Sequence, residues 1–136
     1  MKKMTQVSAN AAFVLGQIEG NGIQFIAENL GYSDIDVSRI INSLKYIDQY
    51  EKSSNQAVKT FFSRPRTAQL IADLMTACNW LNWYWFNYLK RGEVYFSAYA
   101  KEAVDYFSDC YNKMYEYVGC GKVSDAIAAE VFKIIH

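Results

Sequence analysis

Residues 67–91 read TAQLIADLMTACNWLNWYWFNYLKR. The only proline of the chain, Pro65, lies just before this stretch, which is apolar on nearly every side of a helix. A helix of this kind is either central in a fold or covered by a partner. Successive positions step about 100° around a helix, so the side chains of Trp80, Trp83 and Trp85 cannot all point into one core. We therefore expect Trp83 and Trp85 to contact another helix or another chain.

The sequence on either side of this stretch also predicts helices. No segment alternates apolar and polar residues as a strand would, and glycines stand where helices would end. A length of 136 residues fits one domain. We predict an all-α, single-domain bundle of five to six helices spanning residues 1–136, with residues 67–136 as its aromatic-rich part. The expected helices cover residues 8–19, 22–30, 33–49, 67–91, 93–118 and 124–135, and residues 56–62 are expected to add another turn or two of helix.

Charge is balanced overall but unevenly distributed. The formal net charge is zero, which is untypical of a nucleic-acid-binding domain. Residues 59–91 carry an excess of positive charge, whereas residues 92–118 carry an excess of negative charge. These two blocks either face each other or mark two surfaces. Aromatic residues make up 16% of the chain, more than a core of this size needs, which favours a contact surface.

Residues 26–44 read IAENLGYSDIDVSRIINSL. Ala27 is small where two helices would cross, and Gly31 stands where a tight turn would need a positive φ. The stretch resembles a helix-turn-helix, and residues 37–42, VSRIIN, are similar to the recognition helix of lac-repressor-type headpieces. The resemblance covers 19 of the 136 residues and implies contacts with duplex DNA. The residues that it places on the groove and the phosphates are Ser33, Ser38, Arg39 and Asn42.

Two features of the sequence count against DNA. Asp34 and Asp36 begin the supposed recognition helix, where they suit the helix dipole but would repel phosphates. Positive charge is also scarce around the motif, so Arg64 and Arg66 could contact phosphates only if the fold brings them alongside. A helix corner with a purely structural role therefore stays open as an alternative.

Four carboxylates are expected on one face of the helix at 93–118, opposite its apolar side: Glu102, Asp105, Asp109 and Glu116. Paired carboxylates on such a face could serve general acid–base catalysis or bind a hard cation. The face could also be simply solvated, or it could be a docking strip for a basic partner. A strip of this kind could imitate a phosphate backbone and block a nucleic-acid-binding protein. This is the basis of an alternative function, a protein-binding inhibitor or adaptor. Such a protein could be a phage or mobile-element factor with an anti-defence role, or an immunity protein.

The sequence offers little chemistry for catalysis. His136 is the only histidine, and no phosphate-binding or dinucleotide-binding glycine motif occurs. We expect no catalytic residues, no metal and no cofactor. Cys78, Cys110 and Cys120 form no Cys-x-x-Cys pair, which favours a reducing, cytoplasmic setting. The longest charge-free stretch, residues 74–89, is shorter than the roughly 20 apolar residues of a membrane span, so no membrane partner is expected.

Together these features predict a non-enzymatic regulatory protein. The leading hypothesis is binding of duplex DNA through residues 26–44, with the aromatic and C-terminal helices completing the core and forming a homodimer. Docking on a protein target through the acidic strip and the aromatic surface is the alternative.

Overall fold

The computed structural model describes residues 34–91, 93–121 and 123–136, which form helices and no strand. This confirms the predicted all-α bundle. The expected helices at 8–19 and 22–30 lie outside the described residues, as do Gly31 and Ser33. The five helices that the structure describes are α3 (Asp34–Lys52), α4 (Gln56–Phe62), α5 (Pro65–Arg91), α6 (Glu93–Gly119) and α7 (Asp125–Ile135).

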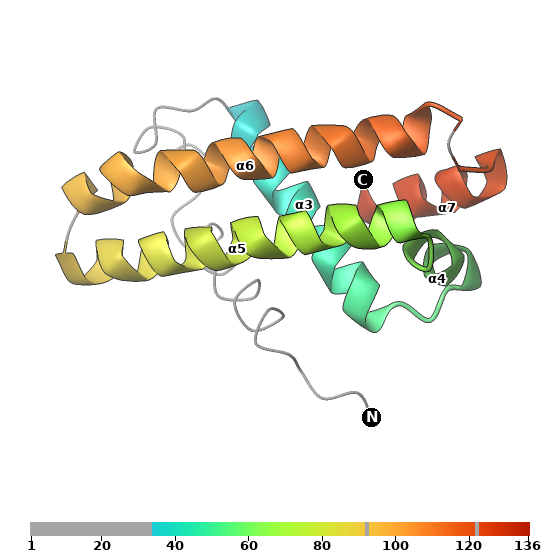
Figure 1. The fold of residues 1–136 in the computed structure, drawn as a ribbon, viewed down its shortest axis with the longest axis horizontal. Helices are drawn as coiled ribbons and strands as arrows, with labels where there is room; N and C mark the ends of the chain where they lie inside the picture. The colour runs from blue at the N-terminus through green and yellow to red at the C-terminus, as the bar shows by residue number, and fades with distance from the viewer. Residues whose placement is uncertain (1–33, 92, 122) are drawn as a thin grey trace.

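The long helices α5 and α6 lie side by side and run antiparallel (Figure 1). Helix α3 crosses behind this pair in the view of Figure 1 and contacts both of its helices. Helices α4 and α7 pack together at one end of the pair. One side of the α5–α6 pair is therefore covered by α3, while the described residues of the opposite side face the viewer.

The start of α5 differs from the prediction. We expected the helix to begin at Thr67, but it begins at Pro65. Proline is tolerated in the first turn because its fixed φ suits a helix and the missing N–H would have no partner there. Thr67 therefore lies within the first turn of α5. Its side chain is fully buried, and its hydroxyl has no hydrogen-bond partner. The preceding helix α4 is capped by Asn55, whose side-chain oxygen accepts from the N–H groups of Ala57 and Val58 at 2.9 and 3.2 Å.

The end of α6 follows the prediction. Gly119 is its last residue, and Gly121 has a φ of +71°, a conformation that costs little only for glycine. Ser124 occupies the N-cap position of α7 as expected, but its side chain makes no capping hydrogen bond.

The core runs between the α5–α6 pair and α3. On α6 the expected apolar side is buried at Ala103, Phe107, Cys110 and Met114. The buried residues that face it are, on α3, Val37, Ile40, Leu44 and Ile47 and, on α5, Leu70, Ile71, Leu74 and Leu81.

A cluster of aromatic rings joins the end of α7 to α3 and α6. The imidazole of His136 lies 4.5 Å from the Phe132 ring, 5.6 Å from that of Tyr46 and 5.8 Å from that of Tyr111, measured between centroids. Tyr46 is fully buried and its hydroxyl has no hydrogen-bond partner. Burial raises the pKa of the Tyr46 phenol well above its ordinary value, so the ring acts as an uncharged packing group.

Candidate functional site

The α3 side chains expected on DNA turn largely toward α6. Arg39 Nη1 donates to Ser108 Oγ at 3.4 Å, and Asn42 Nδ2 donates to Tyr111 Oη at 3.3 Å. Ser38 is exposed on the same helix. Two of the residues carried over from the helix-turn-helix therefore contribute to packing between α3 and α6.

A shallow hollow of about 270 Å³ lies where these side chains meet. Its lining comes from α3 and α6: Ile35, Ser38, Arg39, Asn42, Tyr111, Asn112 and Tyr115. Ser33 and the helix expected at 22–30, which would complete the helix-turn-helix, lie outside the described residues. The duplex-DNA hypothesis thus stays a prediction.

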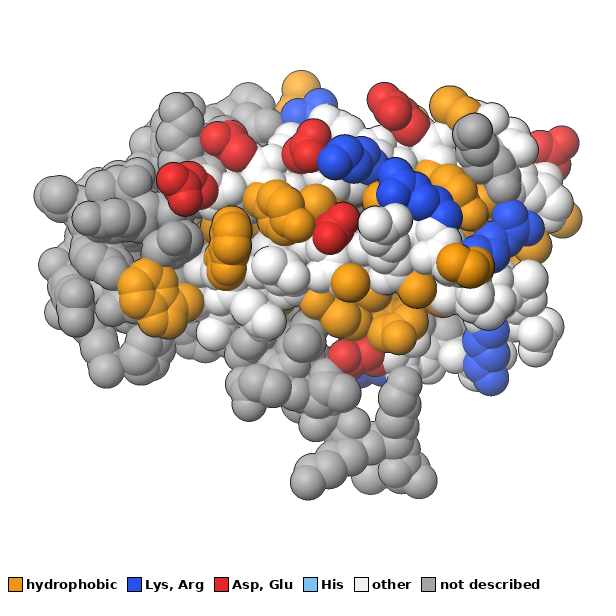
Figure 2. Space-filling model, viewed as in Figure 1, with side chains coloured by type: hydrophobic (Ala, Val, Ile, Leu, Met, Phe, Trp, Pro, Cys, Tyr) orange, Lys and Arg blue, Asp and Glu red, His pale blue; other side chains and the backbone are white. Residues whose placement is uncertain are grey.

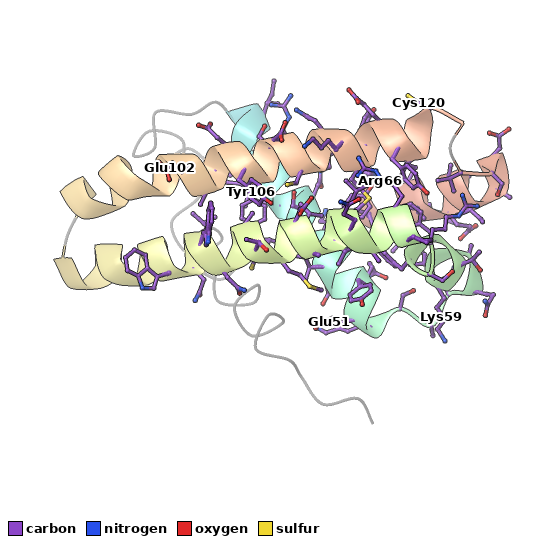
Figure 3. All side chains as sticks on the ribbon, in the orientation of Figure 1. Glu51, Lys59, Arg66, Glu102, Tyr106 and Cys120 are labelled. Carbon is purple, nitrogen blue, oxygen red and sulfur yellow. The ribbon has the colours of Figure 1, made fainter. Side chains whose placement is uncertain are left out.

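Arg66 lies in the first turn of α5, and Arg64 directly precedes that helix (Figure 3 labels Arg66). Arg66 donates to the Gln69 side-chain oxygen at 3.1 Å. It also lines a second hollow, of about 320 Å³, together with Lys113, Glu116 and Tyr117 of α6 and with Cys120, which directly follows that helix. Arg66 lies beside Tyr117 of α6, whereas Arg39 contacts Ser108 of the same helix. Tyr117 and Ser108 are about two and a half helical turns apart, so they lie on opposite sides of α6. The fold therefore does not bring Arg66 alongside Arg39.

The four predicted carboxylates of α6 are all exposed. Glu102, Asp105 and Asp109 follow one another along the helix, whereas Lys113 separates them from Glu116. Lys113 Nζ lies 3.2 Å from Asp109 Oδ2. Glu116 belongs instead to the hollow beside Arg66. Figure 2 shows several red side chains at one end of this face and blue ones from its middle to the other end, where red ones also lie.

Aromatic side chains adjoin the acidic stretch of α6. Trp80 and Trp83 of α5 are 46% and 52% exposed. The Trp80 ring lies against that of Tyr106 on α6, with centroids 5.6 Å apart and planes 33° from parallel. Figure 3 shows Tyr106 between α5 and α6, on the same half of the pair as Glu102. The side chain of Trp85, the other predicted contact residue, lies outside the described side chains.

Sequence reasoning missed Tyr106 and Asp73 as members of this surface. Burial raises the pKa of the Tyr106 phenol, with a further contribution from Cys110 and from Asp73, to which the phenol is hydrogen-bonded. The position of Tyr106, one turn after Glu102, was a usable signal. Asp73 belongs to another helix, so the sequence around Tyr106 could not predict this contact. We call Glu102, Asp105, Asp109, Asp73, Trp80, Trp83 and Tyr106 the acidic–aromatic surface.

The two buried thiols show no sign of nucleophilic activation. Burial raises the pKa of the Cys78 thiol to about 12 and that of the Cys110 thiol to about 11. Both thiols are therefore protonated at neutral pH, and a thiol in this form is a poor nucleophile. Cys120 is exposed. Among the described residues, no three histidine, cysteine or carboxylate side chains are grouped so that they could hold a metal ion.

Within the described part of the chain, no helix combines the length and the apolar character that a membrane crossing requires. Comparison of the whole sequence with protein-family models and with curated proteins finds no match, and comparison with solved structures finds none either.

Proposed function

We propose that this chain is a non-enzymatic binding protein that holds a basic partner protein on its acidic–aromatic surface. The observation that carries the proposal is the juxtaposition of three exposed carboxylates on α6 with the half-exposed Trp80–Tyr106 stack and with Trp83. Flat aromatic side chains give large contact area at interfaces, and the carboxylates select a partner of positive charge.

The chemistry of this surface suits lysine and arginine side chains. Each basic group could pair with a carboxylate of α6, while its alkyl stem or guanidinium plane rests on an indole ring. The geometry favours this function over DNA binding because the surface repels phosphates. Arg39 and Arg66, two of the basic residues predicted to contact DNA, lie on opposite sides of α6.

The proposal is tested with a fluorescently labelled helical peptide that carries lysines one turn apart, by fluorescence anisotropy at low salt. We expect saturable binding that weakens as salt rises. The double variant Asp105→Lys/Asp109→Lys should bind about tenfold more weakly or worse, because it places like charges against the peptide. A peptide of the same length with glutamate in place of lysine should not bind.

The matched control is the double variant Asp48→Lys/Asp125→Lys. It changes the net charge by the same amount on α3 and α7, away from the acidic–aromatic surface, and should bind like the unaltered protein. Equal weakening in both variants would reduce the effect to overall charge and contradict the proposal. If labelled duplex DNA binds in a salt-sensitive manner and the basic peptide does not, the helix-turn-helix hypothesis replaces it.

A further inference from the structure

The outer face of the α5–α6 pair has two ends of opposite charge. At one end lie Glu102 and Asp105 with the aromatic side chains of the acidic–aromatic surface. At the other end Arg66 and Lys113 line one hollow, which they share with the single carboxylate of Glu116, so positive charge is in excess there. Figure 3 shows Tyr106 and Arg66 along the same seam between the two helices, and Figure 2 shows the two kinds of charge on one face. A face with this polarity is complementary to a reversed copy of itself.

We propose that this face also binds a second copy of the chain, as a reversible two-fold dimer. In an isologous interface each residue meets its counterpart through a two-fold axis. A two-fold axis that lies in the interface and runs perpendicular to the helices turns the acidic end of one copy onto the basic end of the other. Two copies aligned in the same direction would instead set like charges against each other.

The register of the dimer follows from positions along α6. The midpoint between Asp109 and Lys113 is the level of residue 111, and so is the midpoint between Asp105 and Tyr117. An axis at this level brings Asp109 onto the Lys113 of the other copy. It also brings Asp105 toward the other copy's Arg66, which lies beside Tyr117. The exposed indoles of Trp80 and Trp83 then lie toward the same basic end, where cation–π contact is favourable.

Two groups oppose this register. Glu116 lies in the hollow of Arg66 and Lys113, so it faces the acidic end of the other copy. Asp73 of α5 faces Tyr106 and Cys110 near the middle of the seam, so the two-fold axis sets it close to its own copy. Two carboxylates at an axis repel each other, and removing their charge should strengthen the dimer.

The size of the face indicates a weak association. The span from Arg66 to Trp83 along α5 is about 26 Å at 1.5 Å per residue, and two helices side by side are about 20 Å wide. The dimer would therefore bury about 1,000 Å² in total, at the lower end of specific interfaces. We expect a monomer–dimer equilibrium that depends on concentration and salt.

Sedimentation velocity of the full chain, without any peptide, tests the dimer. The unaltered protein should shift from monomer toward dimer as its concentration rises, and about 1 M salt, where the Debye length is about 3 Å, should reverse the shift. The variants Asp105→Lys/Asp109→Lys and Arg66→Glu/Lys113→Glu should each be monomeric, because each gives the two ends of this face an excess of the same charge. An equal mixture of the two should form a heterodimer. Asp73→Asn should dimerise more tightly than the unaltered protein.

A mixture that stays monomeric, although circular dichroism shows both variants folded, would overturn the inference. So would an unaltered protein that is monomeric at all concentrations in low salt, or an Asp73→Asn variant that associates more weakly. The dimer does not depend on the proposed function, since its measurement contains no partner. The peptide measurement is made at protein concentrations where the chain is monomeric, so failure of one proposal is separate from failure of the other.

Discussion

The two sides of α6 use their polar side chains differently. On the side toward α3, Ser108 and Tyr111 accept hydrogen bonds from Arg39 and Asn42. On the side toward solvent, Glu102, Asp105 and Asp109 are exposed, and the ion pair of Asp109 with Lys113 joins two residues of α6 itself. The polar groups of the first side hold helices of the same chain together. Those of the second side keep their charge at the surface, where another molecule can reach it.

This contrast bears on the choice between the two functional hypotheses, DNA binding and docking on a protein target. The helix-turn-helix resemblance rests on polar residues of α3 whose side chains partly serve the fold. The acidic strip rests on residues whose exposure has no evident benefit for the fold, since exposed carboxylates that form ion pairs at a surface add little stability. A polar residue that contributes little to folding is the better candidate for binding.

The largest expected effect separates the buried side of α6 from its exposed side. Phe107 is fully buried, and Phe107→Ala should cost about 3–5 kcal/mol of unfolding free energy because it removes a large ring and leaves a cavity. Glu102→Ala on the exposed side should change that free energy by less than about 0.5 kcal/mol. Urea unfolding followed by circular dichroism measures both. Similar losses of unfolding free energy in the two variants would contradict the assignment of one side of α6 as buried and the other as exposed.

A smaller effect tests the side of α6 that faces α3. Asn42→Ala removes the hydrogen bond to Tyr111 and should cost about 1 kcal/mol, because the half-buried network loses a partner. Ser38→Ala, on an exposed position of the same helix, serves as the control and should be nearly neutral. The opposite result, a neutral Asn42→Ala that abolishes salt-sensitive binding to duplex DNA, would make α3 a contact surface as the helix-turn-helix hypothesis requires.

The sequence predicted the helices well because their signals are local. The spacing of Ala103, Phe107, Cys110 and Met114 specifies the buried side of α6, and Gly121 marks the end of that helix. The partners of Arg39 and Asn42 could not be predicted, since each lies 69 residues further along the chain. For the same reason the sequence showed that some tryptophans must leave the core but not that Trp80 would stack on Tyr106. The spacing of residues in one helix predicts which of its sides is buried. A surface formed by two helices depends on how those helices pack together.

The smallest expected effect concerns the aromatic cluster that fastens α7 to α3 and α6. Burial lowers the pKa of the His136 imidazole from its ordinary value of 6.5, and the nearby positive charge of Lys45 on α3 lowers it further. Tyr46 of α3 and Tyr111 of α6 face the ring, and burial raises the pKa of both phenols, so they stay uncharged and offer the imidazolium no counter-charge.

Because the folded state favours neutral His136, its contribution to stability is complete above the ordinary pKa. It is lost as the pH falls from there through the lowered pKa of the folded state. We expect a loss below about 1 kcal/mol, since His136 is exposed to solvent. Denaturant unfolding between about pH 8 and pH 5 should show the loss in the unaltered protein but not in His136→Phe, which keeps an aromatic ring that cannot be protonated. Carboxylates that titrate in the same range affect both proteins equally, so the difference between the two curves isolates His136. If unfolding free energy changes with pH in the same way in both proteins, the His136 ring packs by apolar contact alone. Its protonation then has no effect on how α7 packs against α3 and α6.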